Sequence, residues 1–551
     1  MHHSFRLLLL GLLVSSLVGQ EKPMPRLAVV ITVDQMRADY LVRFRPYFTE
    51  GGFKRLLENG ADYRNCHFRH ANTVTAPGHA TMLSGVHADV HGIIGNEWLD
   101  PVTFIQGNSV EDADSPLVGL PPRMGRYPNA ILEAMSGRSP RNYLGTTVGD
   151  RMKERHGSAA KVFGVADKDR SAILPAGAKA DGAYWTEEGR FVTSTWYRRE
   201  LPAWVEQFNT DHGAAKYFGR TWDRLLDKSV YDTVQGPDDA PGERAENGLP
   251  VTFPKRVDGG RPEFSGAFYG AFDQTPWDNQ FVADMAERLV EAEQLGQDDI
   301  ADLLCIGFSQ PDKAGHAYGP DSHEIMDSIL RLDRELAEFF QFLDQKVGLA
   351  HCLIVLTADH GVCPLPEKIQ AEKGPDAAGR ISGKVLDDHV IAALDAAFGP
   401  LPGDLYWILR DSGYRLNPAA LAEKKLTAER VASEVQTALL AFPGVAGAWT
   451  RAQLVAQTPL DETGEMVRRG FYPQRSADVI YVLRPNFIGV STGTTHGSPY
   501  DYDTHVPQLW FGAGVKPGVH PERVAVEDIA PTLARLLGVE LPPEAKGRRL
   551  F

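Results

Sequence analysis

Four short apolar runs, each ending in polar residues, constrain the fold of this chain more than any other feature of its sequence. They read RLAVVITVDQ, KVFGVADKDR, DLLCIGFSQPD and CLIVLTADHG, and they end near residues 34, 168, 312 and 359. Unbroken runs of Leu and β-branched residues are typical of strands covered on both faces, as in a mainly parallel sheet. Ligands bind beyond the carboxyl ends of such strands. The polar ends are therefore the first places to look for a site.

Helical patterns separate the apolar runs. The clearest covers residues 322–345, where the residues at helical spacing are Ile325, Ile329, Leu332, Leu336, Phe339, Phe340 and Leu343. That spacing indicates core packing and not a site. The alternation of strand and helix predicts an α/β fold with a mainly parallel central sheet and helices on both faces. Two stretches, at about 171–275 and 366–475, break the alternation, and we interpret them as inserted cap regions on one catalytic domain, 20–551.

The N-terminus has the layout of a secretory signal peptide. Arg6 is followed by an apolar stretch from Leu7 to about Leu13, and then by small residues and a polar break. The stretch is too short to span a bilayer comfortably. The alternative, a buried first helix, fits poorly because polar residues and Pro23 follow at once. We expect a signal peptide at 1–19 and a periplasmic or secreted mature protein without stable membrane insertion.

Charge and cysteine content narrow the range of functions further. The formal net charge is -15 and no long run of Lys or Arg occurs, which argues against binding to nucleic acids or anionic membranes.

An oxidising compartment permits disulfides, but the cysteine spacing has no framework pattern. We expect either buried core thiols or one disulfide among Cys66, Cys305, Cys352 and Cys363.

Three aspartates and three histidines stand at or near the predicted strand ends. They are Asp34, Asp312, His316, Asp359, His360 and His496. Each alone is more often a turn residue or an ordinary histidine, but the six together are hard to explain in that way. Carboxylate oxygen and imidazole nitrogen suit zinc, and six ligands divide into two sites of three with open positions. Two such metals support an in-line displacement at phosphorus.

These motifs resemble the alkaline phosphatase superfamily, and in particular its PafA-type alkaline phosphatases. The resemblance spans nearly the whole mature chain. The segments that carry it are VDQMRADY, TVTAPGHATMLSG, HGIIGNEW, ADKDRSAILPAG, SQPDKAGHAYGP, TADHG, THGSPYDYDTHVP and VEDIAPTLARLLG. The metal signatures are general to the superfamily, whereas GNEW and KDRSAILPAG are specific to the PafA type. No CxPSR motif is present, which argues against a sulfatase.

The resemblance implies two Zn²⁺ per chain. It assigns one zinc to Asp312, His316 and His496, and the other to Asp34, Asp359 and His360.

The segment NTVTAPGHATM has two threonines before a proline and a glycine, and the question is whether either threonine takes part in the chemistry. A Thr cap at a helix start would explain the segment without chemistry. By the resemblance, Thr75 is the nucleophile and also a zinc ligand, while Thr73 is local structure.

Three further residues match phosphate-binding groups of the PafA type. They are Asn96 in GNEW, and Lys168 and Arg170 in KDR. We place Lys168 and Arg170 on an extended segment, where residues two apart point to the same side and both reach one anion. Without the surrounding match, KDR would be interpreted as a solvated charge cluster.

The sequence therefore predicts a two-zinc alkaline phosphatase that hydrolyses small-molecule phosphate monoesters through a phospho-threonine intermediate. The alternative is a phosphodiesterase or nucleotide pyrophosphatase on the same site. Lys168 and Arg170 separate the two functions, because a monoester dianion carries one more negative charge than a diester. A catalytically inactive binding protein is disfavoured by the complete set of ligands. We expect the protein to act as a monomer.

Overall fold

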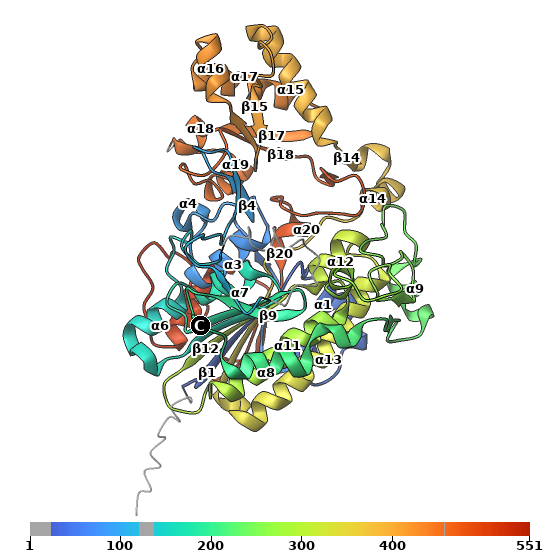
Figure 1. Ribbon diagram of the computed structural model, residues 1–551, viewed down its shortest axis with the longest axis vertical. Coiled ribbons are helices and arrows are strands. Elements are labelled where there is room, and N and C mark those ends of the chain that lie inside the picture. The colour runs from blue at the N-terminus through green and yellow to red at the C-terminus, as the bar shows by residue number, and fades with distance from the viewer. Residues whose placement is uncertain (1–23, 121–136, 457) are drawn as a thin grey trace, which may run out of the picture.

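The computed structural model describes residues 24–120, 137–456 and 458–551. The expected signal peptide, 1–19, lies outside the described residues. Within the described part, a ten-stranded sheet forms the centre of the molecule, and helices pack on both of its faces (Figure 1). The predicted fold class, α/β with a mainly parallel central sheet, is confirmed.

The sheet is parallel in its centre, and the strands that flank this centre on each side pair antiparallel with it. Strands β13, β1, β12, β7 and β8 run parallel to one another, whereas β21 pairs antiparallel with β13, and β9 pairs antiparallel with β8. In order across the sheet, the strands are β22 (Gly518–His520), β2 (Ala61–Tyr63), β21 (Gln508–Gly512), β13 (Cys352–Thr357), β1 (Leu27–Val33), β12 (Asp302–Phe308), β7 (Val162–Ala166), β8 (Gly182–Glu187), β9 (Arg190–Ser194) and β6 (Leu117–Val118).

The four apolar runs of the sequence are the four neighbouring strands β13, β1, β12 and β7. Every residue of these strands is buried, as expected for strands covered on both faces. Val33 pairs with Phe308, and Thr32 pairs with Thr357. This register brings the ends of the strands, and the polar residues that follow them, to one edge of the sheet.

Helices of the two faces come from different parts of the chain. On one side, α11 (Pro276–Ala292) packs on β12 and β7 and contacts α8 (Ala203–His212) and α13 (His323–Lys346). On the other, α7 (Asp169–Ala176) packs on β7, β8 and β12 and contacts α3 (Thr75–Ser84) and α6 (Val148–His156). Helix α13 covers the predicted helical segment almost residue for residue, and the Ser322 hydroxyl caps it by accepting from the Ile325 N–H at 3.2 Å.

A second, smaller sheet lies at the top of Figure 1, away from the central sheet. Its order is β15 (Ile408–Arg410), β16 (Tyr414–Leu416), β18 (Val479–Leu483) and β17 (Val445–Thr450). Helices α15 (Gly383–Phe398), α16 (Pro418–Lys424) and α17 (Ala428–Ala441) pack against it around a hydrophobic cluster of its own. We call this unit, 383–483, the cap.

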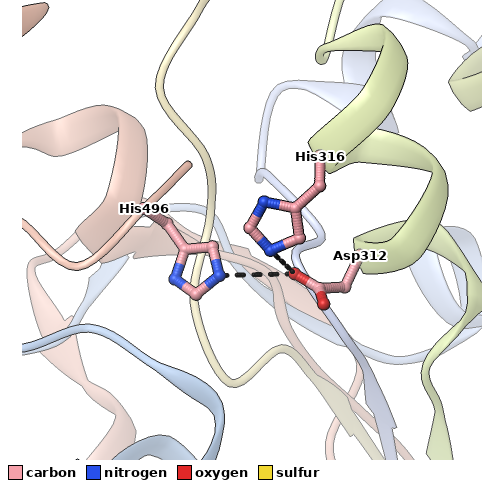
Figure 2. A group of neighbouring side chains, drawn as sticks. All are labelled: Asp312, His316 and His496. Atoms are coloured by element: carbon pink, nitrogen blue, oxygen red, sulfur yellow. Dashed lines mark ion pairs between the residues drawn. The ribbon is translucent and has the colours of Figure 1, made fainter. Parts of the chain in front are cut away.

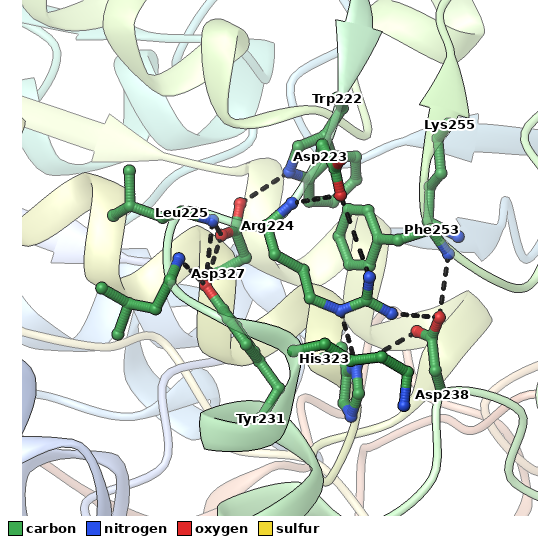
Figure 3. A network of polar contacts seen from close by, with 12 residues as sticks. Trp222, Asp223, Arg224, Leu225, Tyr231, Asp238, Phe253, Lys255, His323 and Asp327 are labelled. Carbon is green, nitrogen blue, oxygen red and sulfur yellow. Dashed lines mark hydrogen bonds and ion pairs between the residues drawn. The ribbon is translucent and has the colours of Figure 1, made fainter.

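Residues 221–256 are attached to helix α13 by a buried polar network (Figure 3). The Asp327 carboxylate, fully buried, accepts from Trp222 Nε1 at 2.7 Å, the Leu225 N–H at 2.7 Å and the Tyr231 hydroxyl at 2.6 Å. Beside it, His323 Nδ1 lies 3.0 Å from Arg224 Nε, and Arg224 also pairs with Asp238. Charge pairing and hydrogen bonds thus hold a segment that forms little regular structure.

All four cysteines are buried and free, so the disulfide considered from the sequence does not form. Burial raises the pKa of the Cys305 and Cys363 thiols above the usual range. They are core residues, which was one of the two expectations from the sequence.

Replacing Asp327 should destabilise the protein, because its removal leaves buried donors without an acceptor. We expect Asp327→Ala to lower the free energy of unfolding by about 3–5 kcal/mol, the cost of removing one partner from a buried charge network. Asp388→Ala is the control, since Asp388 pairs with exposed Lys384 and should change stability by less than about 1 kcal/mol. Urea denaturation followed by circular dichroism measures both, and equal losses would show that the network does not anchor this segment.

Candidate active site

The predicted aspartates and histidines gather at the carboxyl edge of the parallel strands. Asp34 directly follows β1, Asp359 and His360 follow β13, and Asp312 lies in the first turn of α12 (Gln310–Tyr318), just after β12. His496 comes from the loop before α20 (Asp501–Thr504). Segments far apart in the sequence therefore meet at one place, because the strands that carry them are neighbours.

Asp312, His316 and His496 form the first group (Figure 2). His316 lies one turn after Asp312 on α12, and its Nε2 is 3.2 Å from Asp312 Oδ1. His496 Nε2 lies 3.3 Å from the same oxygen. One carboxylate oxygen and two imidazole nitrogens thus face a common point.

Asp34, Asp359 and His360 form the second group, and all three are buried. His360 Nε2 lies 3.4 Å from Asp34 Oδ1 and 3.6 Å from Asp359 Oδ2. None of these three atoms has a hydrogen-bond partner in the described part of the chain. The imidazole rings of His360 and His496 stack with their centroids 3.6 Å apart, so the two groups are adjacent.

Backbone carbonyls orient all three histidines in the same way. His316 Nδ1 bonds to the carbonyl of Thr494, His360 Nδ1 to that of Gly361, and His496 Nδ1 to that of Thr73, each at 2.9 Å. A carbonyl only accepts, so each Nδ1 is the donor. Each Nε2 is then directed toward the carboxylates, which is the arrangement that hydrogen-bonded neighbours impose on metal-binding histidines.

The electrostatics of the site favour bound cations. Burial, followed by repulsion from Asp312, raises the pKa of Asp34, and burial with repulsion from Asp34 raises the pKa of Asp359 well above its usual value. Burial lowers the pKa of His360 well below its usual value, which keeps that ring neutral. Unpartnered buried oxygens beside the neutral imidazole of His360 fit a metal ion, and the nitrogen and oxygen donors of the two groups suit zinc.

Helix α3 begins beside the two groups. It starts at Thr75, the helix start expected from the sequence, with Val74 as the N-cap and without a side-chain cap, so the alternative of a Thr cap does not hold. Thr73 instead donates its hydroxyl to the Ser498 carbonyl at 2.8 Å. Asn96 Oδ1 accepts from the Ala76 N–H at 2.8 Å, which holds the Asn96 amide at the N-terminus of α3, next to Thr75.

Lys168 connects the two groups. Its ammonium lies 2.6 Å from Asp34 Oδ2 and 2.6 Å from Asp312 Oδ2. The extended segment expected around it is wrong, because Lys168 is the N-cap of α7 and Arg170 lies in the first turn of that helix. Both side chains nevertheless line one cavity. They lie close together because α7 begins directly after β7 ends.

Two structurally important residues had no signal in the sequence. Gln35 has a left-handed backbone with φ of 64°. Its side-chain amide donates to Asp312 Oδ1 at 2.6 Å and its backbone N–H donates to Asp359 Oδ1 at 3.2 Å, so Gln35 links the two Asp/His groups. Gly78 lies where α3 passes over the strand end, and a Cβ there would be 2.3 Å from the Asp359 carbonyl oxygen. A polar residue after a strand and a glycine within a helix are common far from any site, so residue type alone could not find them.

Comparison with known proteins gives the family. The sequence pattern of the family described as type I phosphodiesterase / nucleotide pyrophosphatase matches residues 28–505. The chain belongs to this family. It is 34% identical to alkaline phosphatase PafA of Elizabethkingia meningoseptica, with 98% of this chain and 97% of that protein covered. It is also 34% identical to alkaline phosphatase PhoV of Synechococcus elongatus, with 97% and 94% covered. The resemblance to PafA-type alkaline phosphatases is thus confirmed.

The structural comparison agrees. The crystal structure of wild-type PafA matches with a TM-score of 0.86 at 33% identity and covers 96% of this chain and 98% of PafA. A PafA variant altered at one threonine, one asparagine, one lysine and one arginine matches equally well. Murine ectonucleotide pyrophosphatase / phosphodiesterase 5 shares the fold, with a TM-score of 0.51 at 15% identity.

Gly78→Ala tests the close approach of α3 to Asp359. The added Cβ forces Asp359 or the helix to move, and overpacking of this kind costs about 1–3 kcal/mol, or roughly 5- to 150-fold in metal affinity if Asp359 moves. We expect bound metal per chain, measured by plasma emission spectroscopy after dialysis, to fall relative to the wild type. Gly489→Ala is the control, because a Cβ there meets no atom. Unchanged metal content in Gly78→Ala would show that the second group does not bind metal through Asp359.

Proposed function

We propose that this protein is an exported two-zinc alkaline phosphatase that hydrolyses phosphate monoesters through a phospho-threonine intermediate on Thr75. The observation that carries the proposal is the placement of two adjacent Asp/His groups at the N-terminus of a helix that begins with Thr75. The six residues of the two groups would hold the two zinc ions. When bound, zinc stabilises negative charge on the oxygens that attack and leave phosphorus.

The chain's own groups then account for two displacement steps. Thr75 gives its hydroxyl proton to solvent and its Oγ attacks phosphorus, so the Oγ–P bond forms. The bond from phosphorus to the ester oxygen breaks, and the alcohol leaves with a proton taken from solvent. Water next attacks the phospho-threonine, which releases inorganic phosphate and restores the Thr75 hydroxyl. The start of α3 favours the phosphoryl group, because the N-terminal end of a helix attracts anions.

Asn96, Lys168 and Arg170 would bind the remaining phosphoryl oxygens. Asn96 is held beside Thr75 by its bond to the Ala76 N–H. The Lys168 ammonium lies between the two groups, at 2.6 Å from an aspartate of each. The substituted PafA gives independent support: Thr75 and Asn96 are as far apart in this sequence as the threonine and asparagine altered in PafA, and Lys168 and Arg170 are as far apart as the altered lysine and arginine.

A phosphodiesterase or nucleotide pyrophosphatase is the second candidate, and the description of the matched family favours it. It would use the same metals and the same threonine. We place it second because two cations, Lys168 and Arg170, line one cavity, and a diester offers one charged oxygen fewer for them to bind.

We propose further that the enzyme is exported and acts as a monomer. The N-terminal sequence supports export. Among the residues that the structure describes, no helix is both long and apolar enough to cross a membrane. Small-molecule phosphate monoesters are the substrates that fit, and the net charge of -15 disfavours nucleic acids.

Substitution of the two threonines tests the nucleophile. Thr75→Ala removes the attacking hydroxyl and should lower kcat/KM for an aryl phosphate by at least about 1000-fold, as expected for loss of a nucleophile, while Thr75→Ser should retain much of the activity. Thr73→Ala is the matched control: its carbonyl still orients His496, so activity should stay within about 10-fold of wild type. We expect about two zinc ions per chain in all variants. An active Thr75→Ala beside an inactive Thr73→Ala would reverse the assignment.

Removal of the cation pair separates monoesterase from diesterase. A charge-assisted hydrogen bond contributes about 1.5–3 kcal/mol, so Lys168→Ala/Arg170→Ala should lower monoester kcat/KM by at least about 100-fold, allowing for non-additivity. Diester kcat/KM should fall much less, because the diester lacks the extra charge. The assay uses matched aryl monoester and diester substrates with zinc content verified. Equal losses would favour the phosphodiesterase.

A further inference from the structure

A cavity of about 470 Å³ lies beside the first turn of α7, and none of the six residues of the two Asp/His groups lines it. Its wall is rich in carboxylates, namely Asp167, Asp169, Glu187, Glu188 and Asp273. Burial, followed by repulsion from Asp169, raises the pKa of Glu187 to about 8. Lys168 and Arg170, proposed above to bind the phosphoryl group, line the same cavity, but its carboxylates have no part in the proposed phosphatase chemistry.

Three aspartates meet at the wall of this cavity. One oxygen from each of Asp167, Asp273 and Asp278 lies within 4.8 Å of the other two. Asp167 follows strand β7, Asp273 ends helix α10 (Ala267–Phe272), and Asp278 lies in the first turn of α11. Three separate elements thus bring carboxylates to one point. We call these residues the acidic triad.

Lys313 and Thr186 contact two members of the triad. The Lys313 ammonium pairs with Asp167 and lies 3.5 Å from Asp273. The Thr186 hydroxyl donates to Asp167 at 2.6 Å. Three other cations near the cavity pair with carboxylates outside the triad: Lys168 with Asp34 and Asp312, and Arg138 and Arg170 with Asp169. Neither Lys313 nor Thr186 donates a hydrogen bond to the Asp278 carboxylate.

Asp278 gives a second and independent observation that points to a ligand. Only 1% of its surface is exposed, and neither carboxylate oxygen has a hydrogen-bond partner among the described residues. Burial, followed by repulsion from Asp167, raises the pKa of its carboxyl well above the usual value. A buried carboxylate that faces two others without a donor is costly unless a cation binds there.

We propose that Asp167, Asp273 and Asp278 bind a hard divalent cation, Ca²⁺ or Mg²⁺, at a site separate from the two Asp/His groups. The triad offers oxygen donors only, which suit Ca²⁺ and Mg²⁺ and not zinc. Asp167 and Asp273 also line the cavity, so water can complete the coordination shell, as both ions require. Lys313 remains paired with Asp167, and the bound divalent cation coordinates the Asp278 carboxylate, which has no hydrogen-bond partner among the described residues.

Terbium luminescence tests the site on the zinc-loaded enzyme. Tb³⁺ substitutes for Ca²⁺ at oxygen sites, and the aromatic residues Trp185 and Tyr269, which line the same cavity, can sensitise it. We expect saturable luminescence on excitation of the aromatic residues, displaced by Ca²⁺ or Mg²⁺. The ion that displaces terbium at the lower concentration is the preferred occupant. No saturable luminescence, together with no change in Tm at millimolar Ca²⁺ or Mg²⁺, would overturn the proposal.

Three isosteric variants locate the binding. Asp278→Asn and Asp273→Asn should each weaken Tb³⁺ and Ca²⁺ binding by at least about 10-fold, since each removes one charged ligand. Glu188→Gln is the matched control: it removes the same charge from the same cavity outside the triad and should leave affinity within about threefold. Ca²⁺ should raise the Tm of the wild type and of Glu188→Gln, but not that of Asp278→Asn. Wild-type affinity in both triad variants would place the cation elsewhere and sink the proposal.

Discussion

The burial of Asp34, Asp312 and Asp359 within one site is the constraint on which the rest of this structure depends. Each lies at the end of an apolar strand, where water cannot stabilise its charge, and an uncompensated buried carboxylate costs several kcal/mol. Lys168 offsets part of this cost by bonding to two of the three. The proposed zinc ions would offset the rest. The sheet thus concentrates negative charge, and the segments around it are placed to neutralise that charge.

The arrangement of the site could be predicted where the information is local in the sequence. Unbroken apolar runs identified β1, β7, β12 and β13, because a strand covered on both faces has to be apolar throughout. The polar residues after those runs then had to meet, since parallel neighbours end at the same edge of a sheet. His496 follows no such strand, and only the family resemblance placed it with Asp312.

The remaining features depend on tertiary contacts that leave no trace in residue type. Backbone carbonyls of Thr73, Gly361 and Thr494 orient the histidines, and any amino acid can supply a carbonyl. Lys168 was expected on an extended segment, but α7 starts immediately after β7, and a spacing of two fits either geometry. The anchoring of residues 221–256 by Asp327 was invisible as well, because a buried aspartate on an amphipathic helix looks like any other polar position in sequence.

The order of the site residues along the chain has a consequence for biosynthesis. Asp34, Asp312 and His316, Asp359 and His360 are made early or midway, whereas His496 comes near the end. Strand β21, which separates β13 from β2 in the sheet, comes later still. A chain still attached to the ribosome therefore lacks both His496 and a strand of the central sheet. The two Asp/His groups can be complete only when synthesis is almost finished.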